Sequence, residues 1–200
     1  MYGSNYAEIA AITVPVMKRY CDKQGYEFRE LLLEGGGNDY AFKKHEFFTE
    51  LFKEDINVIW YLDVDAIITN LTTPIAGFLM QEFSFYLTRD FNELNGGSVI
   101  IRNTGKGRLI NTFVLDYKND FENEQNLYND KKFIEIIYGE YAVLPHPSIN
   151  SYRYDLYPEC SSYVGKRELG DWHEGDFVLH VPGLSIEKRI EVLKSAKIIE

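Results

Sequence analysis

Apolar residues along the chain fall into short runs and into helically spaced patterns, and the two kinds alternate. Short runs that are rich in β-branched and aromatic residues predict strands. These runs cover residues 58–62, 83–87, 98–101, 141–144 and 177–181, and the alternating stretch 26–32 predicts a further strand.

Helical spacing predicts the segments in between. Ser4 or Asn5 can cap a helix over 6–11, Pro15 can begin a second helical piece that reaches residue 24, and Gly25 is a stop signal. Further helices are predicted over 41–52, 75–80, 109–117, 125–138 and 186–198. The triglycine at 35–37 predicts a surface loop, because the lysine and hydroxyl of a phosphate-binding loop are absent.

The alternation of strands and helices predicts an α/β fold with a central, mostly parallel mixed sheet flanked by helices. With 200 residues, of which 45% are hydrophobic, the chain suits a single domain over 1–200. A catalytic domain excised from a longer chain is the alternative that the length leaves open.

The charge and composition of the chain limit the classes of partner that it can bind. A net charge of −10 repels nucleic acid backbones and anionic membranes, so neither is expected as a partner. No apolar run reaches the roughly 18 residues of a membrane span, and the first residues lack a signal-peptide core. Cys21 and Cys160 lie too far apart in sequence for a zinc-ligand pair and are expected to be free thiols. These features predict a cytoplasmic protein, or a piece of a larger one.

The strand predicted at 58–62 runs directly into two carboxylates, Asp63 and Asp65. Ionised carboxylates at the end of a buried strand are costly to desolvate, and a divalent cation at the carboxyl end of the sheet would compensate that cost. Carboxylate oxygens suit Mg²⁺ or Mn²⁺ that also holds a phosphate. The alternative is an Asp-rich turn after a strand.

A second polar cluster lies between two apolar strands and contains Asp90, Asn95, Gly96 and Gly97. The two glycines let the backbone approach a ligand closely, and the polar side chains suit sugar hydroxyls. The alternative is an ordinary tight turn, because Asn-Gly is a hairpin signal.

Two further candidates are less specific. Glu124 and Gln125 open a predicted helix, where acidic residues also serve as caps. His180 ends the last apolar strand, before Pro182 and Gly183. A histidine there is either a structural residue or a metal ligand beside the two aspartates.

Taken together, these clusters resemble the glycosyltransferases of the GT-A (Rossmann-like) fold that use nucleotide-sugar donors. The chain is most similar to the retaining galactosyl-, mannosyl- and xylosyltransferases, which share four motifs in the same order. Here the motifs are Trp-Tyr-Leu-Asp-Val-Asp at 60–65, the stretch 94–103 with Ile-Arg-Asn, Glu-Gln at 124–125, and His-Val-Pro-Gly at 180–183, while Lys44 matches a family lysine.

The resemblance implies a role for each motif. Asp63, Asp65 and His180 would hold the metal, with an imidazole ligand favouring Mn²⁺ over Mg²⁺. Asp90, Asn95, Gly96 and Gly97 would contact the donor sugar, together with Lys44. Gln125 would lie near the anomeric carbon, with Glu124 beside it, and the catalytic candidates are therefore Gln125, Glu124 and Asp90.

The chain departs from the family pattern at both ends. The family's first strand is almost missing before Ser4, which leaves Ser4 and Tyr6 as candidates for the base-binding side. A family lysine that follows the His-x-x-Gly motif and meets the diphosphate is absent, and Lys188 or Arg189 would replace it near Gly183.

The sequence therefore predicts a metal-dependent glycosyltransferase that moves a glucose-, galactose-, xylose- or rhamnose-type sugar from UDP to a glycan acceptor, with retention. Two alternatives remain: a sugar-nucleotide nucleotidyltransferase, which would need a Gly-rich basic phosphate loop, and a non-catalytic carbohydrate-binding module, which would not need a buried metal site.

Overall fold

The computed structural model describes residues 2–33, 40–91, 93–120, 127–128, 130–145 and 148–200. The chain forms two compact units, each built from more than one segment. Unit 1 comprises Met1–Gly35, Leu62–Leu79 and Pro145–Glu200, and unit 2 comprises Gly36–Tyr61 and Met80–Leu144. The triglycine loop predicted at 35–37 lies outside the described residues.

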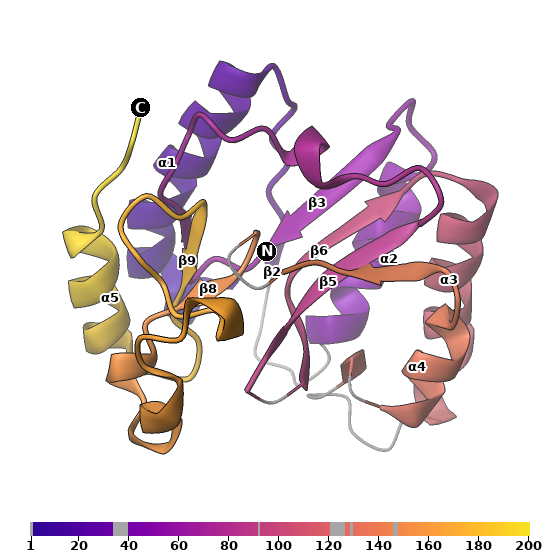
Figure 1. Ribbon diagram of the computed structural model, residues 1–200. Helices are drawn as coiled ribbons and strands as arrows, with labels where there is room; N and C mark the ends of the chain where they lie inside the picture. The colour runs from indigo at the N-terminus through magenta and orange to yellow at the C-terminus, as the bar shows by residue number, and fades with distance from the viewer. Residues whose placement is uncertain (1, 34–39, 92, 121–126, 129, 146–147) are drawn as a thin grey trace. The chain divides into compact units, whose positions relative to one another are not determined.

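The principal elements of unit 1 are two helices and five short strands (Figure 1). The helices are α1 (Ala7–Gln24) and α5 (Ile186–Ser195). The strands are β1 (Tyr2–Gly3), β2 (Leu32–Leu33), β4 (Ala66–Ile68), β8 (Ser151–Tyr152) and β9 (Val178–His180). Short 3₁₀ turns occur at Ser4–Tyr6, Ile75–Phe78, Tyr154–Leu156, Pro158–Tyr163 and Arg167–Leu169.

Helix α1 is continuous, so the division predicted at Pro15 is wrong. Pro15 lies inside the helix with its ring exposed, while Ile9, Val16 and Tyr20 form the buried face. The helix packs against α5 and β4, and this burial outweighs the backbone hydrogen bond that proline cannot make. Gly25 ends the helix in the left-handed conformation (φ 72°), as predicted.

Three strands of unit 1 pair in the order β4-β9-β8, antiparallel between β4 and β9 and parallel between β9 and β8. Strand β4 was not expected from the sequence, because it has only three residues, all of them buried. The strand predicted over 26–32 is also wrong in extent: only Leu32 and Leu33 pair, in parallel with β1.

Unit 2 has a four-stranded mixed sheet in the order β3-β6-β5-β7. Its strands are β3 (Val58–Leu62), whose last residue begins the next segment of unit 1, β5 (Phe85–Asp90), β6 (Glu93–Arg102) and β7 (Tyr141–Val143). Its helices are α2 (Tyr40–Leu51), α3 (Gly105–Asp116) and α4 (Lys131–Ile137), with a 3₁₀ turn at Lys118–Asp120.

The antiparallel pair of β5 and β6 contains a bulge that the sequence pattern did not predict. Tyr86 pairs with Ile100 and Thr88 pairs with Asn95, so the four residues 96–99 of β6 lie opposite one residue of β5. The chain reverses between Asp90 and Glu93, and Asn95-Gly96 is therefore not the hairpin turn. Strand β6 consequently begins five residues earlier than predicted.

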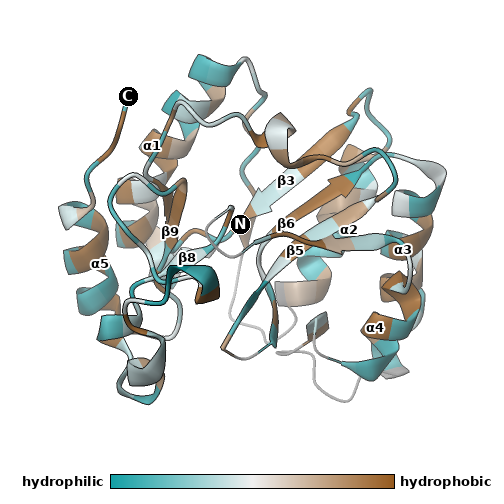
Figure 2. Cartoon of the chain, in the orientation of Figure 1, coloured by the Kyte–Doolittle hydropathy of each residue, from teal (hydrophilic) through white to brown (hydrophobic). Residues whose placement is uncertain are grey.

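Helices α2 and α3 pack on each other in unit 2, and α3 also contacts β6 and α4. Thr104 caps α3, because its hydroxyl accepts a hydrogen bond from Gly107 N. Helix α4 begins at Lys131, after the capping Asp130, and is thus shorter than the helix predicted over 125–138. Figure 2 shows helices with both hydrophobic and hydrophilic surfaces, as expected of helices that each bury one face.

Both units have apolar interiors. In unit 1 the largest fully buried side chains include Tyr20, Ile67 and Tyr152, and in unit 2 they include Phe48, Phe85 and Phe133. Among the residues that the structure describes, no helix combines the length and the apolar character needed to cross a bilayer.

Candidate functional site

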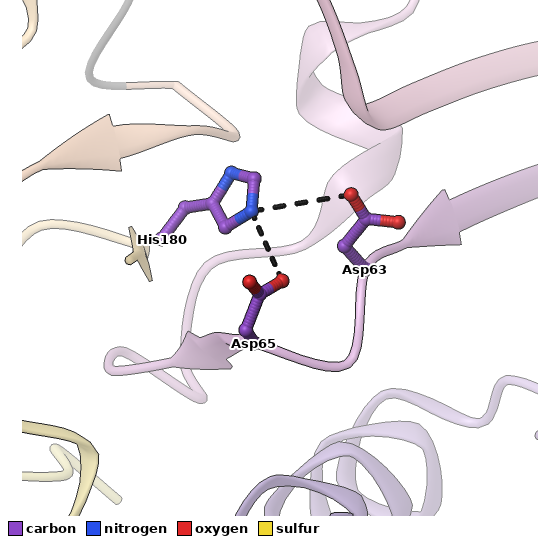
Figure 3. Close-up of side chains that lie close together, drawn as sticks. All are labelled: Asp63, Asp65 and His180. Carbon is purple, nitrogen blue, oxygen red and sulfur yellow. Dashed lines mark hydrogen bonds and ion pairs between the residues drawn. The ribbon is translucent and has the colours of Figure 1, made fainter. Parts of the chain in front are cut away.

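Asp63, Asp65 and His180 come together in unit 1, as the sequence predicts (Figure 3). One ligand atom from each residue lies within 4.8 Å of the others. His180 Nε2 is 3.2 Å from Asp65 Oδ1 and 4.0 Å from Asp63 Oδ2. Two carboxylates and one imidazole converging on one point form a ligand set suited to a divalent metal ion.

The backbone of unit 1 explains why these residues meet. Ala66 in β4 pairs with His180 in β9, and Val181 N donates a hydrogen bond to Asp65 O at 3.2 Å. Val64, between the two aspartates, is held by α1, because Thr13 Oγ1 donates a 2.7 Å hydrogen bond to its carbonyl. The antiparallel pairing therefore brings together residues that are more than 100 positions apart.

His180 is fixed by a partner that the sequence reasoning missed. Asn150 Oδ1 lies 2.8 Å from His180 Nδ1, and both residues are buried. Because an amide oxygen only accepts, Nδ1 donates, and Nε2 is the nitrogen that faces the two carboxylates (Figure 3). Metal-binding histidines use this arrangement, in which the second ring nitrogen donates to an oxygen. No motif around Asn150 indicates this role, since it depends on the register of β8 beside β9.

The two aspartates have different surroundings. The Asp63 side chain is 36% exposed, whereas the Asp65 side chain is 10% exposed. Asp65 Oδ2 also forms an ion pair with Arg189 Nη1, 2.9 Å away. Burial by itself would raise the pKa of Asp65, but His180 and Arg189 outweigh it and hold the pKa below its usual value. Asp65 is therefore a carboxylate at neutral pH.

Four further residues of unit 1 were predicted to contact the nucleotide, and they lie near the start of α1 and after β9. Ser4 and Tyr6 lie in the 3₁₀ turn before α1, and the Tyr6 ring centroid is 5.4 Å from the Arg189 guanidinium. Gly183 follows β9 with φ 72°, a conformation that favours glycine. Lys188 is half-buried on α5, and its Nζ pairs with Glu191 Oε1 at 2.8 Å.

Lys44 and Gly96 meet in unit 2. Lys44 Nζ, on a residue that is 5% exposed, donates a 2.6 Å hydrogen bond to Gly96 O. The ammonium group also lies 4.0 Å from the Tyr61 ring centroid and 4.8 Å from that of Tyr128. A Cβ at Gly96 would lie 2.0 Å from Tyr128 Cε2, so only glycine fits there.

The other polar residues of the β6 bulge bond to one another. Asn95 Nδ2 donates to Asp90 Oδ2 at 2.7 Å, and Asn95 Oδ1 accepts from Gly97 N at 2.7 Å. These contacts fix the polar cluster expected to face a sugar. Glu124 and Gln125, the remaining catalytic candidates, lie outside the described residues.

The sequence also did not predict a buried hydrogen-bond network that includes His45, Asn111 and Tyr128. His45 Nδ1 lies 2.8 Å from Asn111 Oδ1, and His45 Nε2 lies 3.2 Å from the Tyr128 hydroxyl. Burial lowers the pKa of His45 to about 3, so the ring is neutral and its Nε2 accepts a hydrogen bond from Tyr128. The only sequence signal is the position of His45 beside Lys44 on the same helix.

The chain matches no family model. Its sequence is 23% identical to an alpha-1,2-galactosyltransferase of Schizosaccharomyces pombe, over an alignment of 230 residues that covers 91% of this chain. The alignment covers 58% of the relative, so the chain spans under two thirds of that protein's length.

Solved structures show the same fold. A glycosyltransferase involved in the glycosylation of the major capsid of PBCV-1 superposes with a TM-score of 0.70 and 19% identity, over 93% of this chain and 92% of that protein. The galactosyltransferase LgtC superposes with a TM-score of 0.58 and 12% identity, over 100% and 95%. GlyE of Streptococcus pneumoniae superposes with a TM-score of 0.61 and 12% identity, over 100% and 63%. The motifs and the fold agree: this chain has the GT-A fold and is similar to glycosyltransferases that share it.

Proposed function

We propose that this protein is a metal-dependent glycosyltransferase that moves a sugar from a UDP-sugar to a glycan acceptor. The observation that carries the proposal is the convergence of Asp63, Asp65 and His180, with Asn150 directing His180 Nε2 toward the carboxylates. The relatives with similar sequence or fold are glycosyltransferases, which supports this class over a nucleotidyltransferase or a binding module.

Asp63, Asp65 and His180 would hold the metal ion. A divalent ion supplies a Lewis acid that stabilises the negative charge developing on the departing diphosphate. Mn²⁺ is the expected ion because imidazole is a softer ligand than oxygen, with Mg²⁺ as the alternative. Tyr6 and Ser4 are proposed for the uridine side, and Gly183 and Lys188 for the diphosphate.

The bulge of β6 is proposed to bind the donor sugar. Asp90 and Asn95 carry hydrogen-bonding groups suited to hydroxyls, Gly96 and Gly97 leave room for close approach, and Lys44 braces the bulge through Gly96 O. The sugar is a glucose-, galactose-, xylose- or rhamnose-type residue.

For the transfer itself we propose retention of anomeric configuration. Gln125 is a weak nucleophile, so the acceptor hydroxyl attacks from the face that the phosphate leaves. As the acceptor oxygen bonds to the anomeric carbon, the sugar–phosphate bond breaks and the acceptor proton passes to the phosphate oxygen. A glycosyl adduct trapped on Glu124 or Asp90 would replace this proposal with a covalent route.

Calorimetric titration of UDP tests the donor site. Binding is expected in the presence of Mn²⁺ and is expected to be lost with EDTA or in the Asp65→Ala variant. Asp55→Ala is the matched control, because Asp55 is an exposed acidic residue outside the cluster. Binding that is indifferent to both the metal and Asp65 would contradict the proposal.

A panel of UDP-sugars then tests the reaction. Release of UDP identifies a glycosyltransferase, whereas release of pyrophosphate from a nucleoside triphosphate and a sugar phosphate identifies a nucleotidyltransferase. The anomeric proton coupling of the first-formed product, measured by NMR, distinguishes retention from inversion.

A further inference from the structure

Arg189 is a buried cation in direct contact with a proposed metal ligand. The residue is 8% exposed, and its Nη1 lies 2.9 Å from Asp65 Oδ2. Its guanidinium lies over the Tyr6 ring, and its buried Nε has no hydrogen-bond partner among the residues that the structure describes. An arginine side chain in a folded protein carries a positive charge.

The contact divides the two oxygens of Asp65 between two partners. Oδ2 faces Arg189, and Oδ1 faces His180 Nε2 at 3.2 Å. Oδ1 is therefore the Asp65 oxygen directed toward His180, whereas Oδ2 is paired with the Arg189 cation. Arg189 thus acts through Asp65 and is a positioning residue.

Arg189 also sets the charge of the cluster. Asp63 and Asp65 each carry one negative charge, Arg189 carries one positive charge, and His180 is neutral when it ligates a metal. The cluster therefore has a net charge of about −1, which a divalent ion by itself would reverse to about +1. The two negative charges of a nucleotide-sugar diphosphate would return it to about −1.

We propose that Arg189 weakens the binding of the metal ion alone and strengthens that of the diphosphate, so that the site favours the two ligands together over the metal ion by itself. The proposal rests on the proposed function, since it assigns the same site to both ligands. By linkage, the factor by which UDP tightens Mn²⁺ equals the factor by which Mn²⁺ tightens UDP. Arg189 thus disfavours the state in which the metal ion is bound without the diphosphate.

The test measures Mn²⁺ affinity by the loss of the free-ion EPR signal, with and without UDP, on the full chain. In the unmodified protein, UDP is expected to tighten Mn²⁺ binding about 10- to 100-fold, within the usual range of coupling between sites. Arg189→Gln is expected to bind Mn²⁺ alone at least about fivefold more tightly, because a neighbouring positive charge is gone, and to bind UDP more weakly in the presence of Mn²⁺, because the same charge attracts the diphosphate.

Two further variants separate local charge from other effects. Lys194→Gln removes the same charge from an exposed position on α5 and is expected to leave both affinities unchanged. Arg189→Lys keeps the charge and is expected to bind Mn²⁺ alone as the unmodified protein does. Should Arg189→Gln fail to fold, a tightening in Arg189→Lys, or no effect of UDP on Mn²⁺ in the unmodified protein, would still overturn the proposal.

The outcomes also separate this proposal from the proposed function. If UDP binds only with Mn²⁺ but Arg189→Gln binds Mn²⁺ alone as weakly as the unmodified protein, the role of Arg189 is wrong and the donor site stands. If Arg189→Gln tightens Mn²⁺ but UDP binds to neither protein, the nucleotide assignment is wrong, and the proposed role of Arg189 toward the diphosphate is wrong with it.

Discussion

Asn150 Oδ1 accepts a hydrogen bond from His180 Nδ1 over 2.8 Å, inside unit 1. Tyr152 lies on β8, two residues after Asn150, and pairs with His180 on β9; the ring centroids of Tyr152 and His180 are 5.4 Å apart. One amide and one aromatic ring thus fix both the rotation of the imidazole and the nitrogen that it presents.

Replacing Asn150 by alanine is expected to weaken Mn²⁺ binding about 10- to 100-fold, because the imidazole loses the acceptor that orients it. Asn150→Asp is the control, since its carboxylate can accept the same hydrogen bond and should preserve binding. Free-ion EPR measures both affinities. An alanine variant with unchanged Mn²⁺ affinity would show that His180 needs no such support.

Thr13→Val is expected to lower the free energy of unfolding by about 1–3 kcal/mol. The change keeps the side-chain shape but leaves the buried carbonyl of Val64 without the 2.7 Å hydrogen bond from Thr13 Oγ1. Urea unfolding of the variant measures the loss. Thr112→Val, at an exposed position of α3, should change stability by less than about 0.5 kcal/mol; an equal loss in both variants would contradict the prediction.

Gly96→Ala is expected to destabilise the protein by about 1–3 kcal/mol, because the new Cβ would lie 2.0 Å from Tyr128 Cε2 and the tyrosine ring would have to move. Gly105→Ala is the matched control at the start of α3, where a Cβ would meet no atom of the described residues within 4 Å. Thermal unfolding of the two variants tests the difference, and a Gly96→Ala protein as stable as the control would refute the close approach.

The protonation of His45 is expected to account for part of the pH dependence of stability. Burial lowers its pKa from 6.5 to about 3, so between these values the unfolded chain binds a proton that the folded protein does not. The contribution of neutral His45 to the free energy of unfolding is therefore complete above pH 6.5. It is lost as the pH falls toward 3, with a slope of about 1.4 kcal/mol per pH unit.

The His45→Gln variant should lose this part of the slope between pH 6.5 and 4.5, as measured by urea unfolding at each pH. Phe48→Leu is the control, because Phe48 packs against His45 with ring centroids 5.5 Å apart but binds no proton. It should lower stability by a similar amount at every pH. A slope that is unchanged in His45→Gln would mean that other groups account for the acid sensitivity.

Much of this protein can be predicted from local sequence patterns. The strand that ends just before Asp63, the helix that carries Lys44 and the helix stop at Gly25 can be predicted from periodicity, residue size and backbone freedom, which neighbouring residues determine. The Asp-x-Asp and His-x-x-Gly motifs likewise indicate the metal cluster, because their ligand chemistry is visible residue by residue.

Other features depend on contacts between distant segments. Pro15 remains inside a helix because the opposite face is buried, and the strand predicted over 26–32 pairs only at its end. The four-residue bulge of β6 depends on its register with β5, which no local pattern specifies.

The buried partners of the two histidines were likewise decided by the tertiary structure. Asn150, Tyr128 and Asn111 are ordinary polar or aromatic residues in the sequence, and their roles arise only because folding buries Asn150 beside His180 in unit 1, and Tyr128 and Asn111 beside His45 in unit 2. The sequence by itself determined which side chains can bind a metal ion. The fold decided how those side chains are oriented and which cation, Arg189, lies against Asp65, because orientation and local charge depend on residues that are distant along the chain.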